Sequence, residues 1–263
     1  MNLKRYLLAS SFLLTSLAFA EPMKTLPYNE SSNSFCSVNG EYGYPSIDND
    51  LYLCREAYAV AYNCNTKQAD YVYYKTDART LKSMKREDNF QPDESLPQQC
   101  QSQLSDYKKS GYDRGHLVPY ADIDFNKVSA DESFLLSNIS PQKAGLNRQG
   151  WAQLESYVRF WTKAKGELYI YTGPVYKNSK SHKTIGKSKV TVPEYYFKAI
   201  YAPKQNQVIA FIMPNAKVNK KDVAKYRVSL EDIKQRIGFD LFPGLTDEQK
   251  STVSKMWNTT YKK

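Results

Sequence analysis

The sequence predicts a single α+β domain that follows a short leader. Short runs of β-branched and aromatic residues lie between turn-forming residues, which predicts strands. One long stretch instead repeats its apolar residues at helical spacing, and no repeat or linker divides the chain. With 263 residues, 41% of them hydrophobic, the chain is long enough to bury a core and is not wholly disordered.

Residues 1–20 have the layout of a secretory signal peptide. Lys4 and Arg5 precede an uncharged run of about 14 residues, and Ala18-Phe19-Ala20 is a cleavage signature. An uncleaved membrane anchor is the alternative, but the run is shorter than the ~20 residues that span a bilayer. We therefore expect a secreted or periplasmic protein, with no stable membrane association once the leader is removed.

The mature chain is predicted to begin with a loose segment and a β-hairpin. Residues 21–50 are rich in Ser, Asn, Pro and Gly, so we interpret them as a lead-in to a domain spanning 51–263. Residues 51–62 and 71–75 carry β-branched and aromatic side chains on either side of an Asn-Cys-Asn-Thr break, which predicts two paired strands. Residues 76–112 are polar and rich in turn formers, which indicates a long surface connection.

The second half of the chain carries the long helix. Trp151, Leu154, Val158 and Trp161 recur at three- and four-residue spacing, which predicts a helix over 147–165. Strands are expected at 167–171, 195–201 and 208–213, a solvated lysine-rich loop at 177–189, and short helices at 223–227, 230–237 and 247–256, the last capped by Thr246 and Asp247.

An even number of cysteines in an exported chain predicts two disulfides. Cys36, Cys54, Cys64 and Cys100 could alternatively bind zinc, but their gaps of 18, 10 and 36 residues lack the close pairs typical of such sites. If Cys54 and Cys64 lie on one strand, their Cα atoms are about 33 Å apart, beyond a disulfide's reach. Of the two pairings that remain, we favour Cys36–Cys54 with Cys64–Cys100.

The chain is basic and rich in tyrosine. It has 37 Lys and Arg residues against 27 Asp and Glu, a net charge of +10, 22 tyrosines and only two histidines. Removal of the leader lowers the charge to about +8. A basic surface with many tyrosines suits a phosphate-bearing partner, although composition alone favours nucleic acid only slightly.

Two short stretches carry the residues suited to chemistry. The first, at 111–119, holds Arg114 and His116 around Gly115; a histidine accepts a proton near neutral pH, and a guanidinium binds phosphate. The second begins at Ser137 and continues through Asn147, Trp151, Glu155 and Arg159, which recur every four residues. On a helix these four lie along one face, where Trp151 is most simply part of the core. By spacing alone, a buried polar network explains the others as well as a site does.

Together these residues resemble the DNA/RNA non-specific endonucleases of the ββα-metal superfamily, which include mitochondrial endonuclease G. The matching motifs are Asp113-Arg114-Gly115-His116 with Pro119, Asn138-Ile139-Ser140-Pro141-Gln142, Asn147, and Trp151-Ala152-Gln153-Leu154-Glu155. Later landmarks are Thr172-Gly173-Pro174, Val192-Pro193 and Met213-Pro214-Asn215, so the resemblance covers roughly residues 51–260. It implies a central antiparallel sheet flanked by helices, with one long catalytic helix.

The resemblance also implies roles for individual residues. His116 would be the general base that activates water, and Arg114 would contact the phosphate. Asn147 would be the single protein ligand of Mg²⁺, for which Mn²⁺ is the expected substitute. Glu155 would orient water bound to the metal, because eight residues of helix separate its Cα from that of Asn147 by about 12 Å. Zinc is less suited, since no His or Cys cluster stands near.

Three further residues match substrate-binding positions of the family. Arg159 matches a phosphate-contacting arginine on the helix, Arg86 resembles an upstream arginine, and Asn138 belongs to the second motif. Some members carry an additional asparagine where this chain has Phe134, so we assign no supporting role there. His182 lies in the lysine-rich loop and is interpreted as a solvated side chain.

These features predict a secreted metal-dependent endonuclease that hydrolyses DNA and RNA without sequence specificity. A non-catalytic nucleic-acid-binding protein on the same fold and a phosphodiesterase of small molecules are the alternatives. The joint presence of the four residues His116, Arg114, Asn147 and Glu155 argues against the first alternative. An open basic surface would favour a polymer, and an enclosed apolar pocket would favour a small molecule. The sequence predicts neither a preference for DNA or RNA nor an oligomeric state.

Overall fold

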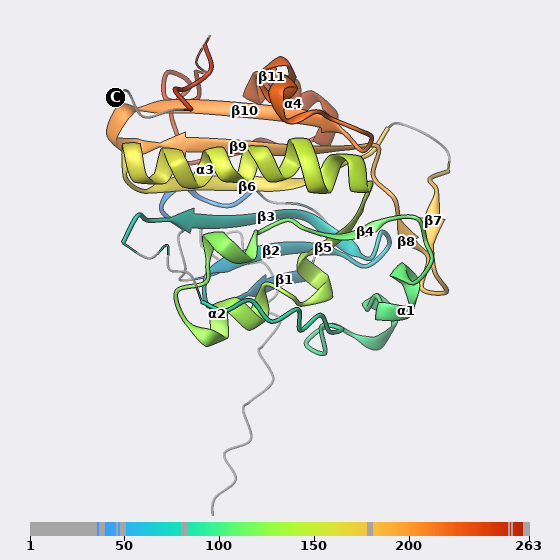
Figure 1. Cartoon of the computed structure of the whole chain (residues 1–263). Helices are drawn as coiled ribbons and strands as arrows, with labels where there is room; N and C mark the ends of the chain where they lie inside the picture. The colour runs from blue at the N-terminus through green and yellow to red at the C-terminus, as the bar shows by residue number, and fades with distance from the viewer. Residues whose placement is uncertain are drawn as a thin grey trace, which may run out of the picture.

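Within the described residues, a seven-stranded antiparallel sheet forms the centre of the molecule (Figure 1). The computed structural model describes residues 36, 40–45, 47, 51–79, 81, 84–177, 181–251, 253 and 255–259. The expected signal peptide, residues 1–20, lies outside them. In spatial order the strands are β1 (Leu51–Cys54), β2 (Tyr58–Asn63), β3 (Gln68–Thr76), β6 (Leu168–Val175), β9 (Tyr195–Ala202), β10 (Gln207–Pro214) and β11 (Arg227–Val228).

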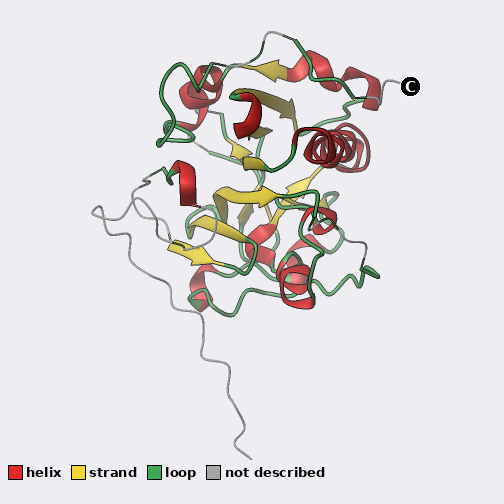
Figure 2. Cartoon of the chain, turned by 90° about the vertical axis from the view of Figure 1, so that its left-hand side faces the viewer, coloured by secondary structure: helices red, strands yellow, loops and turns green. Residues whose placement is uncertain are grey.

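Four α-helices accompany the strands in the described part of the chain. They are α1 (Leu104–Tyr107), α2 (Lys127–Glu132), α3 (Ala152–Lys165) and α4 (Leu230–Ile237). The long helix α3 lies against one face of the sheet, and Figure 2 views it end-on beside the strands. None of these helices is long and apolar enough to cross a membrane, among the residues described.

Short elements complete the chain. Two small two-stranded sheets are formed by β4 (Asp113–His116) with β5 (Ile139–Gln142) and by β7 (Thr184–Ile185) with β8 (Val190–Thr191). A π-helical turn at Leu146–Trp151 leads directly into α3. Single 3-10 turns occupy Gly40–Tyr42, Gln98–Cys100, Tyr120–Asp122, Leu136–Asn138, Pro203–Gln205 and Lys220–Tyr226.

Both faces of the large sheet are buried, because side chains alternate between them along each strand. On β3, Val72 and Tyr74 pack in the cluster that includes Trp151, Leu154 and Trp161 of the long helix. The alternate residues, such as Tyr71 and Tyr73, pack on the opposite face with α4 and with segments near both ends of the described chain. The sheet is therefore the middle of three layers.

The structure corrects the interpretation of the many tyrosines as a surface feature. Tyr73 and Tyr171 stack at 4.4 Å between ring centroids inside the second cluster. Eight tyrosines are among the largest fully buried side chains: Tyr52, Tyr58, Tyr62, Tyr71, Tyr73, Tyr74, Tyr171 and Tyr196. Most are on strands, where aromatic residues pack well and their hydroxyls reach backbone carbonyls.

Most predicted elements are found, with four corrections. The expected helix at 223–227 is the 3-10 helix Lys220–Tyr226, and the loop expected to be solvated at 177–189 includes β7, whose Ile185 is buried. The stretch 51–62 is not one strand: Leu53 and Val60 are paired across a turn, so β1 and β2 form a hairpin of their own. The predicted helix at 247–256 is wrong, since the described residues there form a single turn over 247–250. The expected cap is present, with Gln249 N donating to Thr246 Oγ1, but Val253 N then donates to Val208 O of β10. Pairing with the sheet replaces continuation of the helix.

Both disulfides have the favoured pairing, Cys36–Cys54 and Cys64–Cys100. The geometric premise was nevertheless incorrect, because Cys54 ends β1 and Cys64 follows β2. Cys36 and Tyr44 are buried on the sheet, so the described part of the 21–50 segment belongs to the fold and is not a loose lead-in.

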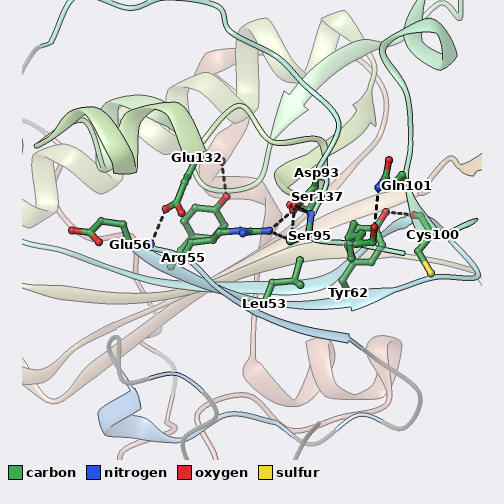
Figure 3. Close-up of polar contacts among 12 residues, drawn as sticks. Leu53, Arg55, Glu56, Tyr62, Asp93, Ser95, Cys100, Gln101, Glu132 and Ser137 are labelled. Atoms are coloured by element: carbon green, nitrogen blue, oxygen red, sulfur yellow. Dashed lines mark hydrogen bonds and ion pairs between the residues drawn. The ribbon is translucent and has the colours of Figure 1, made fainter. Parts of the chain in front are cut away.

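A buried polar cluster attaches the long 76–112 connection to the sheet (Figure 3). Arg55, just after β1, forms an ion pair with Asp93, and both side chains are almost fully buried. Arg55 also donates to Ser95 Oγ at 2.9 Å, and Ser137 donates to Asp93. A buried charge pair of this kind is strongly destabilising to break, so the connection is fixed to the domain near the β4–β5 pair.

Candidate active site

The two sequence motifs are brought together by the β4–β5 pair. Arg114 is opposite Pro141 and His116 is opposite Ile139 in antiparallel register. Gly115 permits this close approach, because a Cβ atom there would lie 2.3 Å from Gln142 Oε1. Since side chains alternate along a strand, Arg114 and His116 are on the same side of β4.

Asn138, expected at a substrate-binding position, has its side chain inside the fold, where it secures this arrangement. Its side chain is fully buried, its Oδ1 accepts from Val118 N at 2.9 Å, and its Nδ2 donates to the carbonyls of Val118 and Ser133. Both N–H donors and the oxygen of its carboxamide are engaged by the backbone, so the side chain holds the chain after β4 against the turn before β5.

His116 lies against an aromatic wall. Its ring centroid is 5.3 Å from that of Phe90 and 5.2 Å from that of Phe134, and its Nε2 is shielded without a hydrogen bond among the described residues. Burial, and then the charges of Arg86 and Arg114, lower the pKa of His116 to about 3. The imidazole is therefore neutral at physiological pH; an anion bound beside the two arginines would offset their charges and make the ring a better proton acceptor.

A cavity of about 630 Å³ opens beside this strand. Among its lining residues are three of the expected site residues and two others that pair with each other: Arg86, Arg114, Asn147, Asp113 and Arg148. His116, Glu155 and Arg159 are not among the lining residues. The lining is therefore predominantly polar and cationic. His116 follows the lining residue Arg114 by two positions on β4.

Asn147 is held in a defined orientation at the cavity. It lies on the π-helical turn, and its Nδ2 donates to Asp113 Oδ2 at 3.0 Å. Arg148 donates to both oxygens of the same carboxylate at 2.8 and 2.7 Å. Although burial opposes the effect, the hydrogen bonds from Arg148 and Asn147 lower the pKa of Asp113 below its ordinary value. An ionised Asp113 thus anchors the amide nitrogen of Asn147.

This orientation suits a cation with few protein ligands. With Nδ2 bound, Asn147 Oδ1 has no partner among the described residues and is available as a neutral oxygen ligand. Mg²⁺ prefers oxygen ligands and keeps several waters, so one carboxamide is a reasonable protein contribution. In the part of the chain that the structure describes, no group of three His, Cys, Asp or Glu side chains could hold a metal ion.

Two arginines at the cavity differ in their pairing. Arg86 forms an ion pair with Asp88 at 2.7 Å and lies 5.4 Å from the ring centroid of Phe134. Arg114 is exposed, lies 4.0 Å from the ring centroid of Phe90, and has no ion pair among the described residues. The guanidinium of Arg114 is therefore the one best placed to receive an anion.

Glu155 and Arg159 belong to a separate polar network beneath α3. Arg159 Nη1 donates to buried Asp122 at 2.8 Å, which also accepts from Tyr74 Oη at 3.1 Å. Arg159 is therefore paired within the fold, and the structure does not bring it to the cavity as a phosphate contact. Burial raises the pKa of Glu155, an effect that the charges of Lys198 and Arg159 oppose.

Lys198 is a member of this network that the sequence did not reveal. It comes from β9, is fully buried, and lies 3.3 Å from Tyr74 Oη and 5.1 Å from the ring centroid of Trp151. Burial lowers its pKa, and the carboxylates of Glu155 and Asp122 oppose that shift. In the sequence, Lys198 stands out only as a lysine among the apolar residues of a predicted strand. That pattern does not indicate which side chains it contacts.

Comparisons with known proteins identify the family of this chain. The model of the DNA/RNA non-specific endonuclease family matches residues 37–248. Nuclease C1 of Cunninghamella echinulata var. echinulata is 33% identical over 221 residues, which cover 78% of this chain and 87% of the relative. The nuclease of Nostoc sp. is 32% identical over 252 residues, 88% of this chain and 90% of the relative.

Endonuclease G is similar in both sequence and structure. The mitochondrial endonuclease G of Homo sapiens is 30% identical over 219 residues, 78% of this chain and 73% of the relative. A chain from the crystal structure of the EndoG/EndoGI complex superposes with a TM-score of 0.74 at 28% identity, covering 80% of this chain and 91% of that chain. The fold is thus the ββα-metal nuclease fold. The chain belongs to the DNA/RNA non-specific endonuclease family.

Proposed function

We propose that this protein is a secreted or periplasmic, metal-dependent endonuclease that hydrolyses DNA and RNA without sequence specificity. The observation that carries the proposal is the cavity beside β4. It unites the unpaired guanidinium of Arg114 with the oriented carboxamide of Asn147, and the neutral imidazole of His116 lies beside it. Phosphodiester hydrolysis requires an anion receptor, a cation site and a proton acceptor, and these three groups supply them.

His116 acts as the general base in this proposal. A base must be unprotonated at working pH, and the environment of Phe90, Phe134 and the nearby arginines keeps the ring neutral. A water entering from the cavity would give its proton to an accessible ring nitrogen of His116 while its oxygen attacks phosphorus. The aromatic wall also fixes the ring plane, which favours one direction of approach.

Asn147 would hold Mg²⁺, or Mn²⁺ in its place, through Oδ1. When bound, the ion would neutralise negative charge that develops on the phosphate and assist departure of the leaving oxygen. Asp113 fixes the amide so that Oδ1 faces away from the carboxylate. Glu155 is not among the lining residues of the cavity, so in this proposal it would act only indirectly, on water around the ion.

Arg114, supported by Arg86, would receive the phosphate. A fork of guanidinium donors matches phosphate oxygens and carries no information about base sequence. The cavity lining is chiefly charged and polar. Such a lining suits a polyanionic chain better than a small molecule, which typically binds in an enclosed apolar pocket. Cleavage without sequence specificity follows, because affinity comes from the backbone of the nucleic acid.

Export is supported by two independent features. The 1–20 segment has the layout of a signal peptide, and both disulfides require an oxidising compartment to form and persist. Several relatives are named mitochondrial, so fractionation of the native host is the direct measurement of location.

The activity is tested with the purified mature protein. Supercoiled plasmid and total RNA should both be degraded with Mg²⁺, and EDTA should stop both reactions. Degradation that persists in EDTA would contradict metal dependence. Binding of plasmid without any cleavage would favour a non-catalytic nucleic-acid-binding protein, and cleavage of bis(p-nitrophenyl) phosphate alone would favour a small-molecule phosphodiesterase.

A further inference from the structure

A second cavity, of about 370 Å³, adjoins the one beside β4. The two share Tyr112, which lines both. The second cavity is built from the β7–β8 region and from the residues that precede β9 and follow β10, including Lys177, Lys183, Glu194 and Tyr195. Val192, Pro193, Pro214 and Asn215 of the lining belong to the later sequence landmarks, but the proposed chemistry uses none of the lining residues.

Positive charge surrounds this second cavity. Lys177 and Lys183 are exposed on its wall, and Lys143 lies 4.0 Å from the ring centroid of Tyr112 at the shared boundary. Glu194 is the acidic residue of the lining. Its carboxylate is engaged by the backbone N–H of Lys177 at 3.0 Å and lies 3.4 Å from Nδ1 of His182. The lysines are thus in excess over the carboxylate.

Aromatic rings accompany the lysines. Lys183 Nζ lies 5.2 Å from the ring centroid of Tyr112, and Lys177 Nζ lies 5.9 Å from that of Tyr195. Both tyrosines are partly exposed, unlike the fully buried tyrosines of the sheet. Ammonium groups beside partly exposed aromatic rings are the combination that binds single-stranded nucleic acid, because lysines contact phosphates and rings stack on bases.

We infer that the second cavity is a binding subsite for a single-stranded segment of the nucleic-acid substrate, next to the nucleotide being cleaved. The inference rests on the proposed nuclease function. A chain whose scissile phosphate lies by Arg114 would pass Tyr112 and place its following phosphate and base against Lys177, Lys183 and Tyr195. Duplex bases are already stacked on each other, so the tyrosines favour an unpaired strand.

Salt-dependent binding separates this subsite from the chemistry. The probe is a fluorescein-labelled 20-nucleotide DNA strand, titrated in EDTA and followed by anisotropy. The variant Lys177→Ala/Lys183→Ala should bind about tenfold more weakly at low salt. Its slope of log K against log salt should fall in magnitude by about 1.4, since each single-strand phosphate contact contributes about 0.7.

A matched pair controls for net charge. Lys163→Ala/Lys255→Ala removes the same charge from exposed lysines that line neither cavity, and its slope should equal that of the unmodified protein. Equal slopes for all three proteins would overturn the subsite. Failure of the nuclease proposal is seen separately, as unmodified protein that does not cleave the strand with Mg²⁺.

The aromatic contribution has its own readout. Tyr112→Leu should weaken binding of the single strand by about fivefold and leave the salt slope unchanged, whereas Tyr112→Phe should restore affinity because it keeps the ring. The effect should be smaller on the same sequence annealed as a duplex. Equal binding by Leu and Phe variants, or equal loss on duplex and single strand, would contradict base stacking on Tyr112.

Discussion

His116 owes its character to its neighbours. Phe90 and Phe134 remove water from the ring, and Arg86 and Arg114 disfavour a second positive charge nearby. The sequence places a phenylalanine where some family members have an asparagine, and the structure shows that Phe134 walls the proposed base. Phe134, to which the sequence motif assigned no role, therefore helps to keep His116 unprotonated.

The pKa of His116 predicts a specific pH dependence. Between the unfolded value of 6.5 and the folded value of about 3, the unfolded chain binds a proton that the folded protein does not. The free energy of unfolding should therefore fall as pH decreases through this window, and this contribution should be constant above it. Urea titrations should show a smaller acid-side slope in His116→Ala. The NMR signals of the His116 ring should not titrate between pH 5 and 7; an inflection near 6.5 would contradict the assigned environment.

Asp113 is predicted to control metal binding through Asn147. Asp113→Ala frees the Asn147 amide, so the Mg²⁺ concentration for half-maximal activity should rise about 10–100-fold. Asn147→Ala should raise it at least as much and also lower the maximal rate. Asp131→Ala, which breaks the Lys127 ion pair on α2, is the control and should leave the requirement unchanged. An unaltered Mg²⁺ requirement in Asp113→Ala would show that the orientation of the amide does not depend on this carboxylate.

At the scale of single residues, the sequence motifs identified groups but not all of their contacts. Arg86, Arg114 and Asn147 meet at one cavity, as the order of motifs implied. Asn138 and Arg159 match family positions equally well. In the structure, however, the side chain of Asn138 is hydrogen-bonded to backbone groups and that of Arg159 to Asp122. The spacing of residues in a sequence predicts which of them lie on the same helix or strand. It does not predict which side chains or backbone groups of a neighbouring element they contact.

The junction between the π-helical turn and α3 positions Asn147 relative to the sheet. Gly150 N donates to Val218 O at 2.9 Å, and a Cβ atom at Gly150 would lie 2.4 Å from Val218 Cγ1. The regular four-residue spacing in the sequence predicted one continuous α-helix. Close packing of Gly150 on the 218 segment accompanies the change from i→i+5 to i→i+4 hydrogen bonding, and such irregular turns are common at functional sites.

Gly150→Ala tests this junction. Overpacking against Val218 should cost about 1–3 kcal/mol of unfolding free energy and reduce activity more than stability alone explains, because Asn147 shifts. Thermal and urea unfolding give the first quantity, and steady-state rates below the transition give the second. The cost should be smaller in a Val218→Ala background, where the closest contact, with Cγ1, is removed and the contact with Val218 Cβ at 2.7 Å remains. An identical cost in both backgrounds would contradict the proposed contact.

Elements with strong local patterns were predictable, and those decided by distant pairing were not. The strands at 195–201 and 208–213 and the helices at 147–165 and 230–237 are found near their expected bounds. At 247–250 the cap forms one turn, after which Val253 pairs with β10 and Trp257 packs edge-on against Trp161. A cap signal specifies where a helix can begin, whereas tertiary contacts decide how far it continues.

For the whole molecule, the two disulfides fasten polar segments to the sheet. Cys36–Cys54 ties the N-terminal segment to β1, and Cys64–Cys100 ties the long connection to the end of β2. Mass spectrometry of unreduced peptides should recover these two pairs and no free thiol. Replacing either pair by serine should cost about 2–5 kcal/mol of unfolding free energy. A Cys36–Cys64 peptide, or wild-type stability without the bridges, would contradict this architecture.

The central claim, that a neutral His116 activates water at the Arg114–Asn147 cavity, is tested most directly by the rate of His116→Ala on plasmid DNA. A general base contributes roughly 10²–10⁴-fold, so kcat should fall at least about a hundredfold. Circular dichroism, thermal midpoint and DNA affinity in EDTA should change little, and His182→Ala should cleave at nearly the wild-type rate. A correctly folded His116→Ala protein, free of contaminating nuclease, that cleaves plasmid at the wild-type rate would contradict the account.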